Sequence, residues 1–242
     1  MNVSQKTVLI TGANRGIGQA LVEEALRRGA KRVYAGMRTV QPHPDARVRP
    51  LRLDVTDAAQ IREAVEEVGA LDLLVNNAGV ALYDDLSQAG VIEQHLAVNV
   101  LGSFHMTNAF LPLLKRSGGA IVNQLSLVAL APLPFIPAYS ISKAAALSMT
   151  QSLRMFLANE GVTVHGVFLG PIDTDMNRGL DIPKASPESA AKSIFDGLEH
   201  GEDDIFPDPA SQAVAAGWHA GAAKALEREF TALLPPRAAN PN

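Results

Sequence analysis

The sequence predicts an α/β protein whose strands form a doubly wound parallel sheet. Short apolar runs alternate along the chain with longer segments of helical period, so strands and helices are expected in turn. Runs such as Val8-Leu9-Ile10 and Leu73-Leu74-Val75 are apolar at successive positions, which is typical of strands covered on both faces. Parallel strands need crossovers long enough to hold a helix, and the helical segments supply them. No polar linker or low-complexity tract divides residues 1–242, so we expect a single domain.

Each element follows from its local pattern. The first strand, 7–11, runs into a glycine-rich turn and then a helix at 17–28, which holds helix-compatible residues such as Ala20, Leu21 and Ala25. Further strands are expected at 32–35, 48–53, 71–76, 120–126 and 163–169, and further helices at 58–68, 91–115 and 138–158. The acidic run Glu199, Glu202, Asp203 and Asp204 predicts a solvated turn. A short strand at 205–206 and a C-terminal helix at about 208–234 complete the order.

Composition and charge exclude several classes of protein. Hydrophobic residues make up 47% of the chain and charged residues 19%, which excludes a disordered or coiled-coil protein. The net charge of −4 offers no broad basic face, so neither nucleic acid nor an anionic membrane is an expected partner. Residues 1–52 nevertheless hold ten basic and three acidic residues. We therefore expect an anionic ligand near the N-terminal third.

Cysteine is absent, which removes disulfides, thiolate catalysis and cysteine-based metal sites together. This usage fits a reducing compartment, and the N-terminal residues show no secretory signal, so we expect a cytoplasmic protein. The most apolar later stretch, 125–138, is interrupted by three prolines and predicts no membrane span. The six histidines have no spacing suited to a metal, and no metal site is expected.

A glycine-rich turn follows the first strand. Its sequence is Thr11-Gly12-Ala13-Asn14-Arg15-Gly16-Ile17-Gly18, with the spacing G-x-x-x-G-x-G. Glycines at a strand-to-helix turn let the backbone approach a pyrophosphate, and the helix N-terminus directs free N–H groups toward it. A tight turn without a ligand is the alternative. The position after the first strand favours a dinucleotide.

Two arginines bear on which dinucleotide binds. A carboxylate about 20 residues beyond the glycines binds the ribose 2′-hydroxyl of NAD, whereas an arginine there suits the 2′-phosphate of NADP. The second strand leads to Arg38 instead of a carboxylate, and we expect Arg15 to project toward the same corner. The pattern favours NADP(H), with two solvated surface arginines as the alternative.

Three polar residues lie at the end of the fifth strand and on the helix that follows it. Tyr139 and Lys143 are four residues apart on one helix, so their tips can reach one site, and Ser126 ends the neighbouring strand. A phenol has a pKa of about 10 and works poorly near neutrality, but an adjacent ammonium stabilises the phenolate. Ser126 can hydrogen-bond a substrate oxygen. The set predicts acid–base chemistry, although a tyrosine and a lysine at this spacing are ordinary when taken alone.

The motifs together resemble the short-chain dehydrogenase/reductase family, in the right order from about residue 6 to 176. They are Thr11–Gly18, Asn76-Asn77-Ala78-Gly79, Asn99-Val100, Ser126 and Tyr139-x-x-x-Lys143. The resemblance implies a Rossmann fold and a catalytic set in which Tyr139 moves the proton and Lys143 lowers its pKa and holds the nicotinamide ribose. It also implies that Ser126 anchors the substrate oxygen and Asn99 holds a water. The implied cofactor contacts are Gly12, Asn14, Arg15, Gly16, Ile17, Gly18, Arg38, Asp54, Val55, Asn77, Ala78, Gly79, Tyr139, Lys143, Ile172 and Thr174.

Two positions depart from the family pattern. Leu125 stands where a first serine is usual, while Ser126 keeps the spacing from the tyrosine. Leu169 precedes Gly170 where a proline is usual, and the loss of a fixed φ predicts a looser loop around Ile172 and Thr174.

We therefore expect an NADP(H)-dependent carbonyl reductase or alcohol dehydrogenase, an oxidoreductase that interconverts a ketone or aldehyde and an alcohol. The alternatives are an NAD(H)-preferring enzyme and a redox sensor that binds the dinucleotide without turnover. A substrate loop is expected at about 175–187. An apolar substrate is suggested by Leu127, Leu130, Leu133, Phe135, Met176 and Leu180. The resemblance implies a homodimer or homotetramer packed through helices at 99–115 and 138–158.

Overall fold

A seven-stranded parallel sheet forms the centre of the protein. The computed structural model describes residues 1–233, and its strand order is β3-β2-β1-β4-β5-β6-β7. The strands are β1 (Thr7–Thr11), β2 (Arg32–Met37), β3 (Val48–Arg52), β4 (Leu73–Asn76), β5 (Ala120–Gln124), β6 (Thr163–Val167) and β7 (Asp204–Ile205). The expected doubly wound α/β fold is confirmed.

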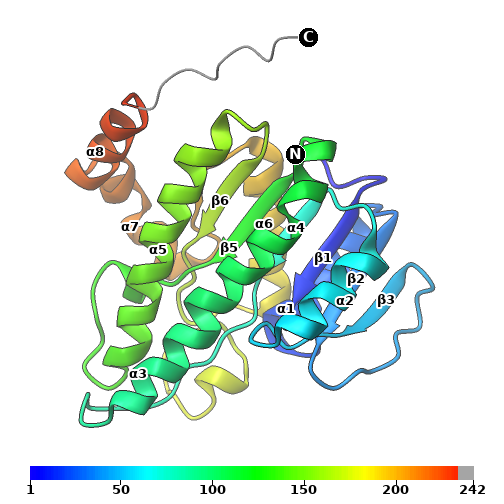
Figure 1. The fold of residues 1–242 in the computed structure, drawn as a ribbon. Helices are drawn as coiled ribbons and strands as arrows, with labels where there is room; N and C mark the ends of the chain where they lie inside the picture. The colour runs from blue at the N-terminus through cyan, green and yellow to red at the C-terminus, as the bar shows by residue number, and fades with distance from the viewer. Residues whose placement is uncertain (234–242) are drawn as a thin grey trace.

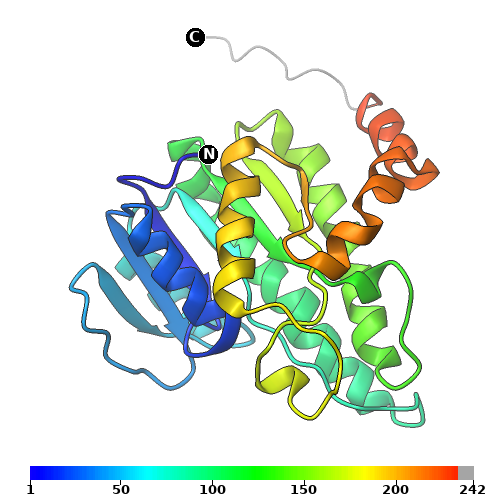
Figure 2. The same cartoon turned by 180° about the vertical axis from the view of Figure 1, so that it is seen from behind.

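Helices cover both faces of the sheet. The α-helices are α1 (Gly16–Arg27), α2 (Ala58–Val68), α3 (Ala89–His95), α4 (Ser103–Ser117), α5 (Pro137–Ala158), α6 (Pro187–His200), α7 (Pro209–Ala220) and α8 (Ala222–Thr231). Green α4 and α5 lie in front of the sheet in Figure 1, and blue α1 and yellow-orange α6 lie on the opposite face in Figure 2. Each face has its own apolar core. Leu21 and Ile194 belong to one, and Phe110 and Leu114 to the other.

The strand order places a crevice at one edge of the sheet. From β1 the chain moves outward to β2 and β3, then returns to β4 on the other side of β1 and continues to β7. The crossovers diverge between β1 and β4, so a crevice forms outside their carboxyl ends, where α/β sheets bind ligands. The glycine turn, Asn77 and Ser126 all follow strands at this edge.

The helix expected at 91–115 is interrupted by a different geometry. It begins at Ala89 and ends at Ser117, and its middle, Leu96–Gly102, is a π-helix, η1. A π segment shifts hydrogen bonds from the i−4 to the i−5 carbonyl and is often found at functional sites. Asn99 lies in this segment and is 3% exposed.

The C-terminal helix expected at about 208–234 is two helices, and this expectation was wrong. Gly221 has the extended backbone angles φ −76° and ψ 158°, which end α7 at Ala220 and start α8 at Ala222. The new direction brings Lys224 and Glu227 of α8 against Asp204 and Arg154. The end of the expected helix, residue 234, lies outside the described residues. The orange α7 and red α8 extend from the edge of the molecule in Figure 2.

The acidic run at 199–204 was also predicted wrongly at both ends, because Glu199 lies in α6 and Asp204 is the first residue of β7. Asp204 is 1% exposed, and its carboxylate is 2.7 Å from Arg154 Nη2 and 2.8 Å from Lys224 Nζ. Burial alone would raise the pKa of Asp204, but the two cations and the Trp218 indole lower it below its usual value. The sequence pattern did not reveal these cationic partners, because they come from α5 and α8.

Candidate functional site

The glycine turn forms a backbone cradle at the start of α1. Gly12 has φ +65°, which favours glycine, and a Cβ there would lie 3.0 Å from Ala78 Cα. A Cβ on Gly18 would clash with the Gly12 carbonyl. No side chain caps α1, and its first turn holds no acidic residue. The helix N-terminus therefore keeps the unpaired N–H groups and the partial positive charge that suit a phosphate.

Asn77 and Thr11 hold this cradle in place. The Asn77 amide donates to the carbonyls of Thr11 at 2.8 Å and Gly12 at 3.2 Å. The Thr11 hydroxyl accepts from the backbone N–H groups of Asn77 and Ala78, each at 3.0 Å. Asn77 was expected to contact the cofactor, but in this structure its amide supports the glycine turn. Thr11 was not singled out by the sequence analysis beyond its place in the motif.

The two arginines have different surroundings. Arg15 Nη1 lies 2.9 Å from Asp175 Oδ2 on the loop after β6. We had expected Arg15 to point to the corner of Arg38, and the ion pair with an oppositely charged group explains the difference. Arg38, directly after β2, is exposed and forms no ion pair or hydrogen bond within residues 1–233.

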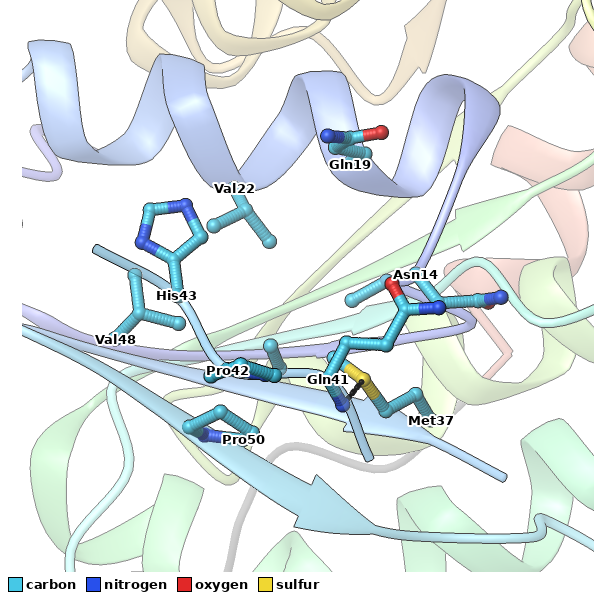
Figure 3. A pocket seen from close by; sticks show the side chains of 11 residues that line it. Asn14, Gln19, Val22, Met37, Gln41, Pro42, His43, Val48 and Pro50 are labelled. Carbon is cyan, nitrogen blue, oxygen red and sulfur yellow. Dashed lines mark hydrogen bonds between the residues drawn. The ribbon is translucent and has the colours of Figure 1, made fainter. Parts of the chain in front are cut away.

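A pocket opens beside the glycine turn, between α1 and the strands β2 and β3 (Figure 3). Gln19 and Val22 enter it from α1, and Asn14 from the turn. The opposite wall is formed by Ala35, Met37, Gln41, Pro42, His43, Val48 and Pro50. Met37, which immediately precedes Arg38, accepts a hydrogen bond at its sulfur from the Gln41 N–H at 3.2 Å. The pocket therefore adjoins both the turn and the strand end that carries Arg38.

Asp54 and Val55 follow β3 at the same edge. The Asp54 carboxylate accepts from the Thr56 N–H at 2.9 Å and from its hydroxyl at 2.7 Å, which closes a local turn. Val55 is 6% exposed, and its side chain packs so closely against Gly102 that a Cβ there would lie 2.6 Å from Val55 Cγ2. The two residues thus connect β3 to the end of the π-helix.

Ser126, Tyr139 and Lys143 meet at the carboxyl end of β5. Ser126 lies near enough to Tyr139 to lower the pKa of the phenol, while the Ser126 hydroxyl donates to the Leu169 carbonyl at 3.3 Å. Lys143 Nζ donates to the Gln124 carbonyl at 2.6 Å and lies 5.6 Å from the centre of the Tyr139 ring. The spacing along α5 thus places the phenol and the ammonium together, as the sequence indicated.

The pKa of Tyr139 differs from the sequence expectation that Lys143 lowers it. Burial raises the pKa of Tyr139 to about 12, against a smaller lowering by the nearby Ser126 hydroxyl. Burial also lowers the pKa of Lys143 to about 8. The ammonium points to a carbonyl and lies over the ring, so it does not offset the burial of the phenol. At neutral pH the phenol is a proton donor in this state.

Asn99 connects the π-helix to the tyrosine helix. Its Nδ2 donates to the Ser142 hydroxyl at 2.9 Å and to the Val80 carbonyl at 3.0 Å, and its Oδ1 accepts from the Val80 N–H at 2.9 Å. Ser142 in turn donates to the Tyr139 carbonyl at 2.7 Å. Both N–H groups of the Asn99 amide are used, so a water in the role implied by the resemblance would donate to one of the residue's two carbonyl oxygens.

An extended segment, Val80 to Asp84, runs from Asn99 to the start of α5. His95 Nε2 accepts from the Leu82 N–H at 3.1 Å, which assigns the proton to Nδ1, 2.7 Å from the Val91 carbonyl. The Asp84 carboxylate accepts from the Ala138 N–H at 3.2 and 3.3 Å, one residue before Tyr139. We call residues 80–84 the strap. His95 and Asp84 were not predicted as site residues, because their partners are backbone groups that no sequence motif reveals.

The loop after β6 is held more firmly than the sequence predicted. The Leu169 carbonyl accepts from the Leu127 N–H at 2.9 Å and the Ser126 hydroxyl at 3.3 Å, and the Gly170 N–H donates to Asp208 at 2.8 Å. Ile172 is 4% exposed and pairs with Ala185. A Cβ on Gly16 would lie 3.1 Å from Thr174 Cγ2, so this loop also lies against the glycine turn. The three hydrogen bonds replace the restraint that a proline would give.

None of the helices in residues 1–233 is long and apolar enough to cross a bilayer. The site described above is built instead at one edge of a sheet, from turns that follow parallel strands.

Comparisons with known proteins agree with this geometry. A family model described as short chain dehydrogenase matches residues 6–184. A short chain dehydrogenase from Burkholderia cenocepacia, solved in complex with NADP, is 36% identical, with a TM-score of 0.87 over 97% of this chain and 100% of that chain. An NADPH-dependent 1-acyldihydroxyacetone phosphate reductase from Schizosaccharomyces pombe is 37% identical over 77% of this chain and 68% of its own length. A 3-oxoacyl-[acyl-carrier-protein] reductase from Escherichia coli is 32% identical over 74% of this chain and 79% of its own.

Proposed function

We propose that this chain, which belongs to the short-chain dehydrogenase family and is an oxidoreductase of that family, uses NADP(H) to interconvert a carbonyl compound and an alcohol. The observation that carries the proposal is the meeting of Tyr139, Ser126 and Lys143 beside an uncapped helix N-terminus that suits a pyrophosphate. A dinucleotide and an acid–base group would then share one edge of the sheet.

Tyr139, Ser126 and Lys143 would each have a separate role in the reaction. The nicotinamide, when bound, supplies or accepts the hydride. In reduction, Tyr139 gives its phenolic proton to the carbonyl oxygen, and Ser126 donates a hydrogen bond to that oxygen as negative charge develops. A positive charge on Lys143 would favour the phenolate that forms, a contribution that does not offset the burial of the phenol in the ligand-free protein. Alcohol oxidation uses the same groups in reverse.

The arginines support NADP(H) over NAD(H). Arg38 is free to receive a phosphate, and the second strand ends without the carboxylate that would repel one. Arg15 can leave its exposed pair with Asp175, because such surface pairs are weak. One solved relative holds NADP, and one curated relative is named as NADPH-dependent.

An apolar carbonyl compound is the proposed substrate, bound in part by the loop at about 175–187. Large apolar side chains near the site remain exposed, namely Leu130, Leu133, Phe135 and Met176. Singly exposed apolar residues are ordinary, but a group from two loops near one site is typical of a binding surface. The names of two relatives give an acyl compound as the substrate that is reduced.

A titration with NADPH and with NADH tests the cofactor, with energy transfer from the single tryptophan, Trp218, as the signal. Tighter binding of NADPH, and loss of that preference in Arg38→Asp, would support the role of Arg38. Equal preference in Arg38→Asp and wild type would indicate that Arg38 is a solvated surface residue. Binding of neither cofactor would refute the proposed function.

Turnover is tested with a panel of aliphatic ketones and aldehydes, followed by loss of NADPH absorbance. Tyr139→Phe should lower kcat by about 100- to 10,000-fold and leave NADPH affinity close to wild type. Charged carbonyl compounds that turned over best would contradict the apolar substrate. A Tyr139→Phe protein with full activity would contradict the role of the tyrosine.

We also propose that the protein is a homodimer or homotetramer packed through α4 and α5, and that it is cytoplasmic. Phe104 on α4, Leu101 on the adjoining π-helix η1, and Ile141 and Phe156 on α5 are exposed large apolar side chains. Small residues on α5 permit close approach of a second copy. Sedimentation that shows only monomer would refute the assembly. The absence of cysteine supports a reducing compartment.

A further inference from the structure

A hollow opens between α7 and the loop that follows β5. It is lined by Leu130 of that loop and by Ala213, Val214, Gly217 and Trp218 of α7, and it has a volume of about 470 Å³. Pockets that bind small organic molecules have volumes of this order. Leu130 is 37% exposed and Val214 is 41% exposed, so two large apolar side chains of the lining remain in contact with water.

The side chains that line the hollow offer apolar contacts. The only polar side-chain atom among the five lining residues is the Trp218 indole nitrogen, and its N–H donates to the Asp204 carboxylate at 2.7 Å. The Trp218 ring packs against Phe168, with ring centroids 5.2 Å apart. A polar ligand group would lose hydrogen bonds to water here without gaining others from these side chains. The hollow therefore suits a hydrocarbon chain.

Gly217 lines the hollow, and the fold does not require a glycine there. Its backbone is helical, and a Cβ at this position would have no atom within 4 Å. Glycine within a helix is less stable than alanine, and α7 is otherwise rich in alanine. An alanine would therefore fit and stabilise the helix. The missing side chain instead leaves space beside Leu130 and Trp218.

Both walls of the hollow are connected to Ser126, the residue proposed to bind the substrate oxygen. Ser126 and Leu130 are the two ends of a single 3₁₀ turn. Such a turn rises about 2 Å per residue, so Leu130 lies about 8 Å from Ser126 along it. On the other wall, Phe168 immediately precedes Leu169, whose carbonyl accepts from the Ser126 hydroxyl at 3.3 Å. A ligand that extends from Ser126 past Leu130 would enter the hollow.

We propose that this hollow binds the hydrocarbon chain of the carbonyl substrate, an inference that deepens the proposed function and rests on it. The substrate class is a straight-chain aldehyde or ketone whose chain passes Leu130 and lies over Gly217, against the Trp218 ring. Each methylene group that leaves water adds to the affinity, so the enzyme would select for chain length. Short carbonyl compounds would contact only the groups around Ser126.

Two variants on α7 test the hollow with substrates of two lengths. Gly217→Leu puts a side chain into the hollow. Ala216→Leu, the matched control, adds a side chain at an exposed position of the same helix that does not line it. The value of kcat/KM is measured for butanal and for decanal with NADPH, and calorimetry measures NADPH affinity. The emission of Trp218, the single tryptophan, reports the binding of decanol without turnover.

The proposal predicts that chain-length selectivity changes in one variant only. Gly217→Leu should lower the ratio of kcat/KM for decanal to that for butanal by about tenfold, the loss expected when about two methylene groups are no longer buried. Ala216→Leu should keep the wild-type ratio, and both variants should bind NADPH as wild type does. Decanol should shift the Trp218 emission to shorter wavelength in wild type and Ala216→Leu but not in Gly217→Leu. Gly217→Ala should raise the melting temperature.

Other outcomes overturn the proposal. A wild-type ratio in Gly217→Leu, with no effect of decanol on the Trp218 emission of wild type, would exclude the hollow as a chain site and leave the proposed function intact. An equal fall of the ratio in both leucine variants would assign the effect to the helix as a whole. A lower melting temperature in Gly217→Ala would show that the glycine serves the fold. Wild type that neither binds NADPH nor reduces either aldehyde would refute the proposed function itself.

Discussion

Lys143 is a single residue whose ionisation links stability to function. Its ammonium is buried and has one hydrogen bond, to the Gln124 carbonyl, and burial lowers its pKa to about 8 from 10.5. Such a group costs stability whenever it is charged, because few interactions replace its water. The destabilising charge lies where it would favour a phenolate. Residues that lower stability in this way are typical of functional sites.

Lys143→Met should therefore be more stable than wild type at pH 7, and this difference in stability should shrink as the pH rises. Below pH 8 the lysine is protonated in both the folded and the unfolded state, so the cost is complete. Between pH 8 and 10.5 the folded state has lost the proton and the unfolded state has not, so wild-type stability rises with pH. The difference in melting temperature between the variant and wild type should shrink over this range. A constant difference would contradict the lowered pKa.

Asp175 should compete with the cofactor phosphate for Arg15. Their ion pair is exposed, so its contribution to affinity is small, about 0.2 to 1 kcal/mol, which corresponds to about a 1.5- to 5-fold change. Asp175→Asn should raise NADPH affinity within this range and leave NADH affinity close to wild type. The gain should diminish at high salt because screening weakens the pair. Asp181→Asn, on the same loop, is the control, and an equal gain there would indicate a general charge effect.

At the scale of elements, the strap joins the π-helix to α5. Asn99 holds Val80 at one end, His95 holds Leu82 in the middle, and Asp84 caps the start of α5 at the other end. The helix supplies no side-chain cap of its own at Ile136. The position of Tyr139 therefore depends on a carboxylate from a distant segment of the chain.

Asp84→Ala should lower kcat by about 10- to 100-fold, because small misplacements of a catalytic group are costly. Cofactor affinity should stay near wild type, since the strap does not reach the glycine turn. Asp84→Asn keeps an acceptor oxygen and should restore most of the activity. The control is Asp85→Ala, whose carboxylate bonds only the Ser87 N–H among the described contacts. If Asp84→Asn were as slow as Asp84→Ala, the cap would not be the cause.

The sequence predicted elements best where their pattern is local. The helix at 58–68 matches α2, and the four-residue spacing of Tyr139 and Lys143 placed them together on α5. The π-helix around Asn99 could not be predicted, because a single wider turn leaves apolar spacing almost unchanged. Gly217 was missed for a related reason, since a glycine within a helical pattern does not show whether the space above it is packed or open.

At the scale of the whole molecule, a buried ion cluster joins the C-terminal helices to the sheet. Arg154 of α5 pairs with Asp204 of β7 and Glu227 of α8, and Lys224 of α8 pairs with the same two carboxylates. The Trp218 indole of α7 donates to Asp204 at 2.7 Å. All four ions are mostly buried and their charges balance, so each depends on the others for its solvation. The sequence could not show this, because the four residues come from three separate elements.

Glu227→Gln should destabilise the protein by about 3 to 5 kcal/mol, because it leaves an excess positive charge among buried groups. Glu229→Gln, an exposed change on the same helix, should shift stability by less than about 0.5 kcal/mol. Denaturant unfolding measures both values. Because α7 packs through Trp218 on Phe168, which lies just before the Leu169 loop, hydrogen exchange in 168–171 should also increase in Glu227→Gln. Increased exchange in α8 with no change at 168–171 would show that the cluster fastens the helix without supporting the site.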